Sequence, residues 1–354
     1  MHKELKTNFR VIVFLLLLFG CKSITGPTAP EVIFVSAGNS PRAICLNSVT
    51  NKIYVTNYYS DDVTVIDGVT DNTTTVAAGN SPRSICVNPT TNKIYVANVD
   101  SDNVTVIDGA TNSTTTVAAG DGPEGICVNQ STNKIYVANS GSGDVTVIDG
   151  ATNSTVTVAA GNGPSAICVN PTTNKIYVAN YDSDDVTVID GGTNSTTTVA
   201  VGIFPSSICV NPNTNNIYVA NSGNVTVIDG ATNSTATVSG RDDPRAICVN
   251  TNTNKIYVAN YDRDDVTVID GETKDVTIVA VGDDPRAICV NPNTNMIYVA
   301  NYFSDDVTVI DGATNETTTV AAGDGPVAIG VNQNTNKIYV ANSWSSNVAV
   351  LYYE

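Results

Sequence analysis

Histidine is nearly absent from this chain of 354 residues, because its single copy, His2, lies within the first 20 residues. A domain that begins after this segment has no imidazole. Ser-His-Asp and Cys-His catalysis, imidazole general bases and His-ligated zinc, copper or haem are therefore excluded from that domain. The sequence also lacks a phosphate-binding glycine loop, a nucleophile elbow and a metal-ligand cluster. We accordingly expect no cofactor and no metal site.

Positive charge is also scarce. The chain has 17 lysines and arginines against 34 aspartates and glutamates, which gives a net charge of −17. Three of the basic residues, Lys3, Lys6 and Arg10, fall in the first 20 residues with a single acid, so the remainder is more acidic still. Because such a surface repels phosphate backbones, nucleic acid is not expected as a partner.

Only one long apolar run is present, at residues 11–19, and Gly20 and Cys21 follow it. A basic start, a short apolar segment and a small residue before the cleavage point are typical of an export signal, and the run is too short to span a bilayer. The end of this segment resembles the lipobox of prokaryotic lipoproteins, which implies lipidation of Cys21. We expect a signal peptide at 1–20, a lipidated Cys21 with a tether at 21–30, and an exported protein held at the cell envelope by its lipid alone. The alternative is an ordinary signal peptide with an incidental cysteine.

The rest of the chain is built from one repeat, best seen in a Lys-Ile-Tyr-Val-Ala-Asn segment. Its tyrosines are 41 residues apart, except for one interval of 39: Tyr54, Tyr95, Tyr136, Tyr177, Tyr218, Tyr257, Tyr298 and Tyr339. A period near 40 with strand-like content predicts an all-β propeller. The first repeat contains four short alternating runs separated by turn residues, at 41–47, 52–57, 63–67 and 73–78, which we name strands a to d. We therefore predict a single domain at 31–354 with eight four-stranded antiparallel blades.

The last repeat ends without a strand d, whereas residues 31–38 match strand d and precede the first strand a. The N-terminal strand is thus expected to complete the last blade. This 1+3 arrangement closes the ring and removes its open edges.

Several segments resemble the YVTN β-propeller family of surface-layer-type and exported prokaryotic proteins. Residues 54–57 read Tyr-Val-Thr-Asn, and the other copies read Tyr-Val-Ala-Asn. The Pro-x-x-Ile-Cys-Val-Asn and Val-Thr-Val-Ile-Asp-Gly runs are also similar to that family. The resemblance implies the fold but little biochemistry, since the motif residues look structural, and such propellers commonly have seven blades.

The repeated tyrosines and cysteines are interpreted as packing residues. The tyrosine lies in a strand that is apolar on both faces, and its hydroxyl needs a polar partner near a sheet edge or the channel. One position of strand a carries Cys45, Cys86, Cys127, Cys168, Cys209, Cys248 and Cys289, with Gly330 in the eighth repeat. We expect small buried apolar residues there, and a soft-metal or redox ring remains the alternative.

Charged residues divide between the two ends of the predicted ring. Lysine begins most strands b opposite the aspartate that ends strand c, as in Lys52 with Asp67, so we expect cross-strand ion pairs. Asn216 and Met296 interrupt this series. Acidic pairs such as Asp61 and Asp62 occupy the b-to-c loops, where solvated turn residues are favoured over calcium ligands.

Arginine and loop aromatics fall on the opposite face, chiefly in blades six, seven, eight, one and two. The candidate binding residues are Arg42, Arg83, Arg245, Arg286, Tyr58, Tyr59, Tyr261, Tyr302, Phe303 and Trp344. Arginine, tyrosine and tryptophan are enriched in binding hot spots. Harmless drift of duplicated repeats explains the same pattern equally well.

We expect a monomeric, non-catalytic envelope lipoprotein that binds a protein or glycan partner through this face, as a surface-layer or adhesion component. The alternative is a propeller enzyme, such as a lyase or lactone hydrolase, with a histidine-free acid-base site at the channel mouth. It would require a single non-repeated carboxylate or lysine near the axis, and none stands out in the repeats. A purely structural spacer is a third hypothesis.

Overall fold

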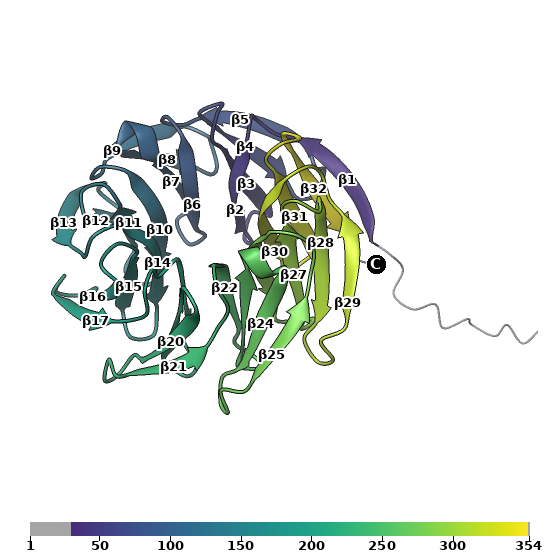
Figure 1. Ribbon diagram of the computed structural model, residues 1–354. Helices are drawn as coiled ribbons and strands as arrows, with labels where there is room; N and C mark the ends of the chain where they lie inside the picture. Colours follow the sequence, from purple (N-terminus) through teal and green to yellow (C-terminus); the bar gives the residue numbers. More distant parts are fainter. Residues whose placement is uncertain (1–29, 353–354) are drawn as a thin grey trace, which may run out of the picture.

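Eight four-stranded antiparallel sheets form a ring in the computed structural model, which describes residues 30–352. Figure 1 shows the sheets arranged as blades around a common axis, one for each sequence repeat. The prediction of an eight-bladed all-β propeller is therefore confirmed. The signal peptide, Cys21 and nearly all of the tether lie outside the described residues.

Each blade runs from an inner strand a to an outer strand d. The inner strands are β2 (Pro41–Asn47), β6 (Pro82–Asn88), β10 (Pro123–Asn129), β14 (Pro164–Asn170), β18 (Ser207–Asn211), β22 (Pro244–Asn250), β26 (Pro285–Asn291) and β30 (Pro326–Asn332). The b strands are β3 (Lys52–Asn57), β7 (Lys93–Asn98), β11 (Lys134–Asn139), β15 (Lys175–Asn180), β19 (Asn216–Asn221), β23 (Lys255–Asn260), β27 (Met296–Asn301) and β31 (Lys337–Asn342).

The outer half of each blade is equally regular. The c strands are β4 (Asp62–Asp67), β8 (Asn103–Asp108), β12 (Asp144–Asp149), β16 (Asp185–Asp190), β20 (Asn224–Asp229), β24 (Asp265–Asp270), β28 (Asp306–Asp311) and β32 (Asn347–Tyr352). The d strands are β5 (Thr73–Ala77), β9 (Thr114–Ala118), β13 (Thr155–Ala159), β17 (Thr196–Ala200), β21 (Thr235–Ser239), β25 (Val276–Ala280), β29 (Thr317–Ala321) and β1 (Glu31–Ser36). Two short 3-10 helices, η1 (Val99–Ser101) and η2 (Tyr261–Arg263), interrupt b-to-c loops, and no helix within residues 30–352 is long and apolar enough to cross a membrane.

The ring closes as the sequence predicts. Strand β1 pairs antiparallel with β32, with Val35 opposite Val348, and so completes the eighth blade. Figure 1 shows the purple first strand beside the yellow last strand. Because β1 covers the outer edge of β32, this blade has the same four-stranded form as the other seven.

The core lies between blades and not inside any one of them. Each b strand is buried on both faces, and Tyr54 packs with Val63 of its own blade against Ile94 of the next. Burying a side chain of this kind contributes about 1.5–3 kcal/mol, so each blade depends on its neighbours. The packing role predicted for the tyrosine is confirmed at 0% exposure. Its expected polar partner is not found, since the Tyr54 hydroxyl has no hydrogen-bond partner within residues 30–352, and desolvation raises its pKa to about 12.

A ring of amides joins the ends of the inner strands. Asn47 Nδ2 donates to Asn92 Oδ1 of the next blade at 2.8 Å, and the contact recurs around the molecule. The last member, Asn332, donates to Asn51 at 2.6 Å and completes the circle. The asparagine that ends each strand a is thus a connector between blades, a role that its sequence repeat alone does not specify.

The lysines that begin the b strands also connect blades, which corrects the expected ion pairs. Lys52 is the strand partner of Asp67 as predicted, but its Nζ donates to the carbonyl of Gly109 in the next blade at 2.8 Å. The same contact recurs for Lys93, Lys134, Lys175, Lys255 and Lys337. The ammonium group reaches across because the c-to-d turn of the next blade presents a free carbonyl there.

Both interruptions of the lysine series have a structural reason. Asn216 is too short to reach Gly271, and Lys274 donates to that carbonyl at 2.6 Å from within the same turn. Met296 faces the eighth blade, whose strand d comes from the N-terminus, so that blade has no c-to-d turn to receive a lysine. Met296 packs instead beside the apolar cluster of Ile338 and Leu351.

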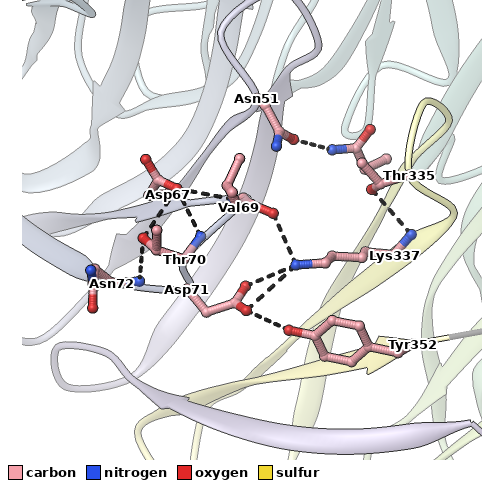
Figure 2. Close-up of polar contacts among 11 residues, drawn as sticks. Asn51, Asp67, Val69, Thr70, Asp71, Asn72, Thr335, Lys337 and Tyr352 are labelled. Carbon is pink, nitrogen blue, oxygen red and sulfur yellow. Dashed lines mark hydrogen bonds and ion pairs between the residues drawn. The ribbon is translucent and has the colours of Figure 1, made fainter.

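The seam between the eighth and first blades carries an additional polar cluster (Figure 2). Lys337 Nζ forms an ion pair with Asp71 at 3.3 Å, and the Tyr352 hydroxyl also donates to Asp71. Lys337 lies over the Tyr352 ring, 4.5 Å from its centroid. Residues from the two ends of the folded domain are therefore tied together where the ring closes.

The strand-a cysteines are free thiols of intermediate exposure, so they are packing residues as expected but are only partly buried. Each packs against an apolar cluster between two blades, and Cys45 and Val87 of the next blade lie against the same cluster. Burial raises the pKa of these thiols, to about 12 for Cys289, which keeps them protonated and weakly nucleophilic near neutral pH. Within residues 30–352, no group of three or more His, Cys, Asp or Glu residues is placed to hold a metal ion.

Candidate binding face

The d-to-a and b-to-c loops meet on one face and are held together by short backbone contacts. Tyr58 N donates to the carbonyl of Ser40 at 2.9 Å, and Tyr302 N donates to that of Asp284 at 2.8 Å. Acidic side chains take part in the same network: Asp61 Oδ1 accepts from Ser81 N at 2.8 Å. These carboxylates therefore stabilise the loops by hydrogen bonding, which is a role typical of solvated turn residues.

Four arginines predicted from sequence come together at the mouth of the channel. Each follows the proline that opens strand a, a position that directs it toward the axis. Together they line a hollow of about 300 Å³, which we call the arginine mouth: Arg42, Arg83, Arg245 and Arg286, with Ser84, Glu124 and Val327. These arginines are up to 244 residues apart in the sequence, and closure of the ring brings them together.

Positive charge at the mouth is only partly neutralised. Arg83 pairs with Glu124 at 3.4 Å and Arg286 with Asp284 at 2.9 Å. Neither Arg42 nor Arg245 forms an ion pair with any residue in the range 30–352. Burial lowers the pKa of Arg42, and the nearby charge of Arg83 lowers it further. Two guanidinium groups without a carboxylate partner thus lie at one opening of a protein with a net charge of −17.

The predicted loop aromatics hold these arginines in place. The Arg286 guanidinium lies 3.3 Å from the centroid of the Tyr302 ring. Arg42 lies over Tyr58 at 5.5 Å, and Arg245 lies over Tyr261 at 5.2 Å. Cation–π contacts of this kind contribute about 0.5–2 kcal/mol each and limit the positions that the guanidinium groups adopt.

Three aromatic rings form an exposed platform beside Arg286. Trp344 contacts Tyr302 with centroids 4.5 Å apart and Phe303 with centroids 6.0 Å apart. Trp344 and Phe303 are each 56% exposed, which is unusual for a packed aromatic pair. Tyr59 is exposed as well and contacts Tyr58 edge to face at 5.2 Å. All ten candidate residues therefore lie on this face. Five of them do not line a hollow, namely Tyr58, Tyr59, Tyr302, Phe303 and Trp344.

A second hollow of about 320 Å³ adjoins the mouth, and we call it the aromatic hollow. Its walls include Tyr181, Phe204 and Tyr261 from three successive blades. Arg245 lines both hollows, so they are neighbours on this face. Neither Tyr181 nor Phe204 is among the ten candidate residues predicted from the sequence. Their meeting depends on the loop geometry, which the repeat pattern does not reveal.

Glu124 is a further residue that the sequence reasoning undervalued. It replaces arginine in the third blade, and it is a non-repeated carboxylate at the channel mouth. The expectation that no such carboxylate stands out is therefore wrong. The substitution of glutamate for arginine at the strand-a opening was the available signal, and the structure shows that this position points to the axis.

No protein-family model matches the sequence, and no curated protein matches it. Solved structures resemble it in fold. Hydrazine synthase from Kuenenia stuttgartiensis has a TM-score of 0.65 at 19% identity, over 90% of this chain and 97% of that chain. Dihydro-heme d1 dehydrogenase NirN in complex with DHE has a TM-score of 0.71 at 14% identity, over 90% of this chain and 78% of that chain. At such identities the likeness shows the propeller fold alone.

Proposed function

We propose that this protein is a non-catalytic lipoprotein of the cell envelope, anchored through Cys21, whose YVTN-type propeller binds a protein or glycan partner. The observation that carries the proposal is the convergence of four arginines with exposed aromatics on one face of an otherwise acidic molecule. Guanidinium groups recognise carboxylates with two parallel hydrogen bonds, and aromatic rings supply apolar contact area. An acidic surface elsewhere discourages binding of anionic partners at other positions.

The test is a glycan and envelope-extract binding screen with the soluble domain of residues 31–354. The variant has Arg42, Arg286, Tyr302 and Trp344 changed to alanine, and we expect it to lose most of the binding. A matched control changes two exposed valines of the opposite face, Val49→Ala and Val69→Ala, and is expected to bind normally. Unaltered binding by the four-residue variant would contradict the assignment of this face as the binding face.

The anchor is tested separately with radiolabelled palmitate in the full chain. Incorporation that disappears in Cys21→Ala supports lipidation at this residue, and equal labelling of the two proteins contradicts it. This readout is independent of the binding face.

Glu124 gives the enzyme hypothesis one specific observation in its favour. A carboxylate beside arginines at a channel mouth has the groups that a lyase or lactone hydrolase requires, namely a proton acceptor and an anion clamp. The test is turnover of lactones and of uronate polymers by the 31–354 domain. Turnover that is lost in Glu124→Gln supports the enzyme, whereas no turnover by the unaltered domain dismisses it.

A further inference from the structure

Phe204 occupies a strained backbone position that no other blade assigns to a large residue. The residue before each strand-a opening has a positive φ: Ser40, Ser81, Gly122, Gly163, Phe204, Asp243, Asp284 and Gly325. Glycine adopts this left-handed conformation freely and aspartate tolerates it, whereas a bulky aromatic with a φ of 52° is an outlier. Strain of this kind is found where a side chain is needed for function.

Nothing in the fold requires the phenylalanine ring. It is 48% exposed, and its ring contact is with the loop residue Tyr181, at 5.2 Å between centroids. The backbone does not need it either. Phe204 N donates to Asp184 Oδ1 at 2.8 Å, and Gly325 N makes the equivalent contact with Asp305 at 2.9 Å. Glycine therefore supports the same turn without strain, and the phenylalanine is retained at a conformational cost.

The ring lines the aromatic hollow, whose walls have the character of a sugar-binding subsite. Tyr181, Phe204 and Tyr261 provide flat apolar surfaces suited to the C–H faces of a pyranose ring. Ser222, Asp243 and Asp262 line the same hollow and offer hydrogen-bonding groups. Pockets that combine aromatic walls with a few placed polar groups are typical of small-ligand sites.

The adjoining arginine mouth adds a preference for negative charge. Arg245 belongs to both hollows, so a chain of two or more sugar units that fills the aromatic hollow extends toward Arg42 and Arg286. Arg42 has no carboxylate partner within residues 30–352 and is free to accept one from a ligand. A carboxylate on the neighbouring sugar unit fits the fork of a guanidinium group.

We propose that the two hollows form one binding site for a carboxylate-bearing oligosaccharide, with a sugar ring in the aromatic hollow and its neighbour's carboxylate at the arginine mouth. This inference rests on the proposed function and names its ligand class. It makes Phe204 and Arg245 specificity residues.

The test compares tetragalacturonate with the neutral tetrasaccharide galactotetraose by isothermal titration, using the domain of residues 31–354. We expect the acidic probe to bind at least tenfold more tightly, because a charge-assisted hydrogen bond discriminates by about that factor. Phe204→Gly is expected to weaken its binding about tenfold through the lost ring contact. Arg245→Gln is expected to reduce the preference for acid over neutral probe.

Phe204→Gly separates a binding role from a structural one. Glycine relieves the left-handed strain, so the melting temperature should stay the same or rise by up to about 3 °C while affinity falls. The inference is overturned if Phe204→Gly binds tetragalacturonate as tightly as the unaltered domain, or if the unaltered domain binds the neutral probe equally well or neither probe. Binding to envelope extract distinguishes this failure from a failure of the proposed function. If extract binding is still lost in the variant with Arg42, Arg286, Tyr302 and Trp344 changed, the proposed function stands, with an acidic protein as the partner.

Discussion

Single substitutions that break the repeat are matched by a second change in a contacting blade. Gly330 replaces the cysteine of the other strands a. Leu46 replaces the valine that packs against the same junction cluster as such a cysteine, as Val87 does with Cys45. A Cβ atom on Gly330 would lie 2.6 Å from Leu46 Cδ1 and 3.2 Å from Ile44 Cγ2. The larger leucine thus occupies the space that the missing side chain leaves.

This pairing predicts a measurable coupling. Gly330→Cys alone forces Leu46 to move and should cost about 1–2 kcal/mol of unfolding free energy by overpacking. Leu46→Val alone should leave a small void. The double variant restores the contact found in other blades, so we expect a favourable coupling of about 1 kcal/mol in a double-mutant cycle by urea denaturation. Additive effects would contradict the pairing.

The position of a residue in the fold could be predicted from the sequence better than the contacts that its side chain makes. The repeat correctly assigned the tyrosine to a buried strand and the four arginines to one face. It placed Lys52 opposite Asp67 correctly but missed that the ammonium group reaches Gly109 in another blade. A strand register fixes neighbours within one sheet, whereas a contact between sheets depends on the angle between blades. The same limit hid the meeting of Tyr181 and Phe204.

The elements most exposed to pH are the turns from strand c to strand d. In the first blade Asp67 Oδ1 accepts hydrogen bonds from Val69 N at 3.0 Å and Thr70 N at 2.9 Å. These backbone N–H groups lower the pKa of Asp67, and the same cause acts in five equivalent turns, at Asp108, Asp149, Asp190, Asp229 and Asp270. Six repeated carboxylates are therefore stabilised in the ionised form by the fold.

The lowered pKa values fix the direction of the pH dependence. Because the folded pKa lies below the unfolded value of about 3.9, the stabilisation is present above that pH and is lost as the pH falls through the folded value. Unfolding between pH 4 and pH 2.5 should therefore take up protons, because these carboxylates have the higher pKa in the unfolded chain, and the urea midpoint should fall as the pH is lowered. Asp190→Asn removes one of these six carboxylates and should flatten this dependence. An identical pH profile for Asp190→Asn would argue against these turns.

The whole molecule depends on the pairing of its two ends. Strand β1 supplies the buried Val35 and covers the edge of β32, so a chain that begins at Gly38 has an open blade. We expect this truncation to lose of the order of 3–5 kcal/mol through lost burial and strand hydrogen bonds. A synthetic peptide of residues 30–37 should restore the melting temperature in a concentration-dependent manner.

The matched control is the same peptide with Val35→Asp, which buries a charge and should not rescue the truncated chain. Equal melting temperatures for the full and truncated domains would show that the ring is held by the contacts between blades alone. Closure itself was predictable from sequence, because residues 31–38 match the strand that the last repeat lacks. The polar cluster of Lys337, Asp71 and Tyr352 was not predictable, because these three residue types do not occur together at the same positions in any other repeat.

Near-identical blades carry a risk of assembling in the wrong order, because most junctions use the same Asn–Asn and Lys–Gly contacts. Three junctions are different. Lys274 belongs with Asn216, Met296 belongs beside a blade without a turn, and Leu46 belongs with Gly330. A blade that docks one place out of step, or one that is borrowed from a second chain, loses these matched pairs while keeping all the common contacts. The irregular positions therefore favour the correct order of the blades over these alternative assemblies.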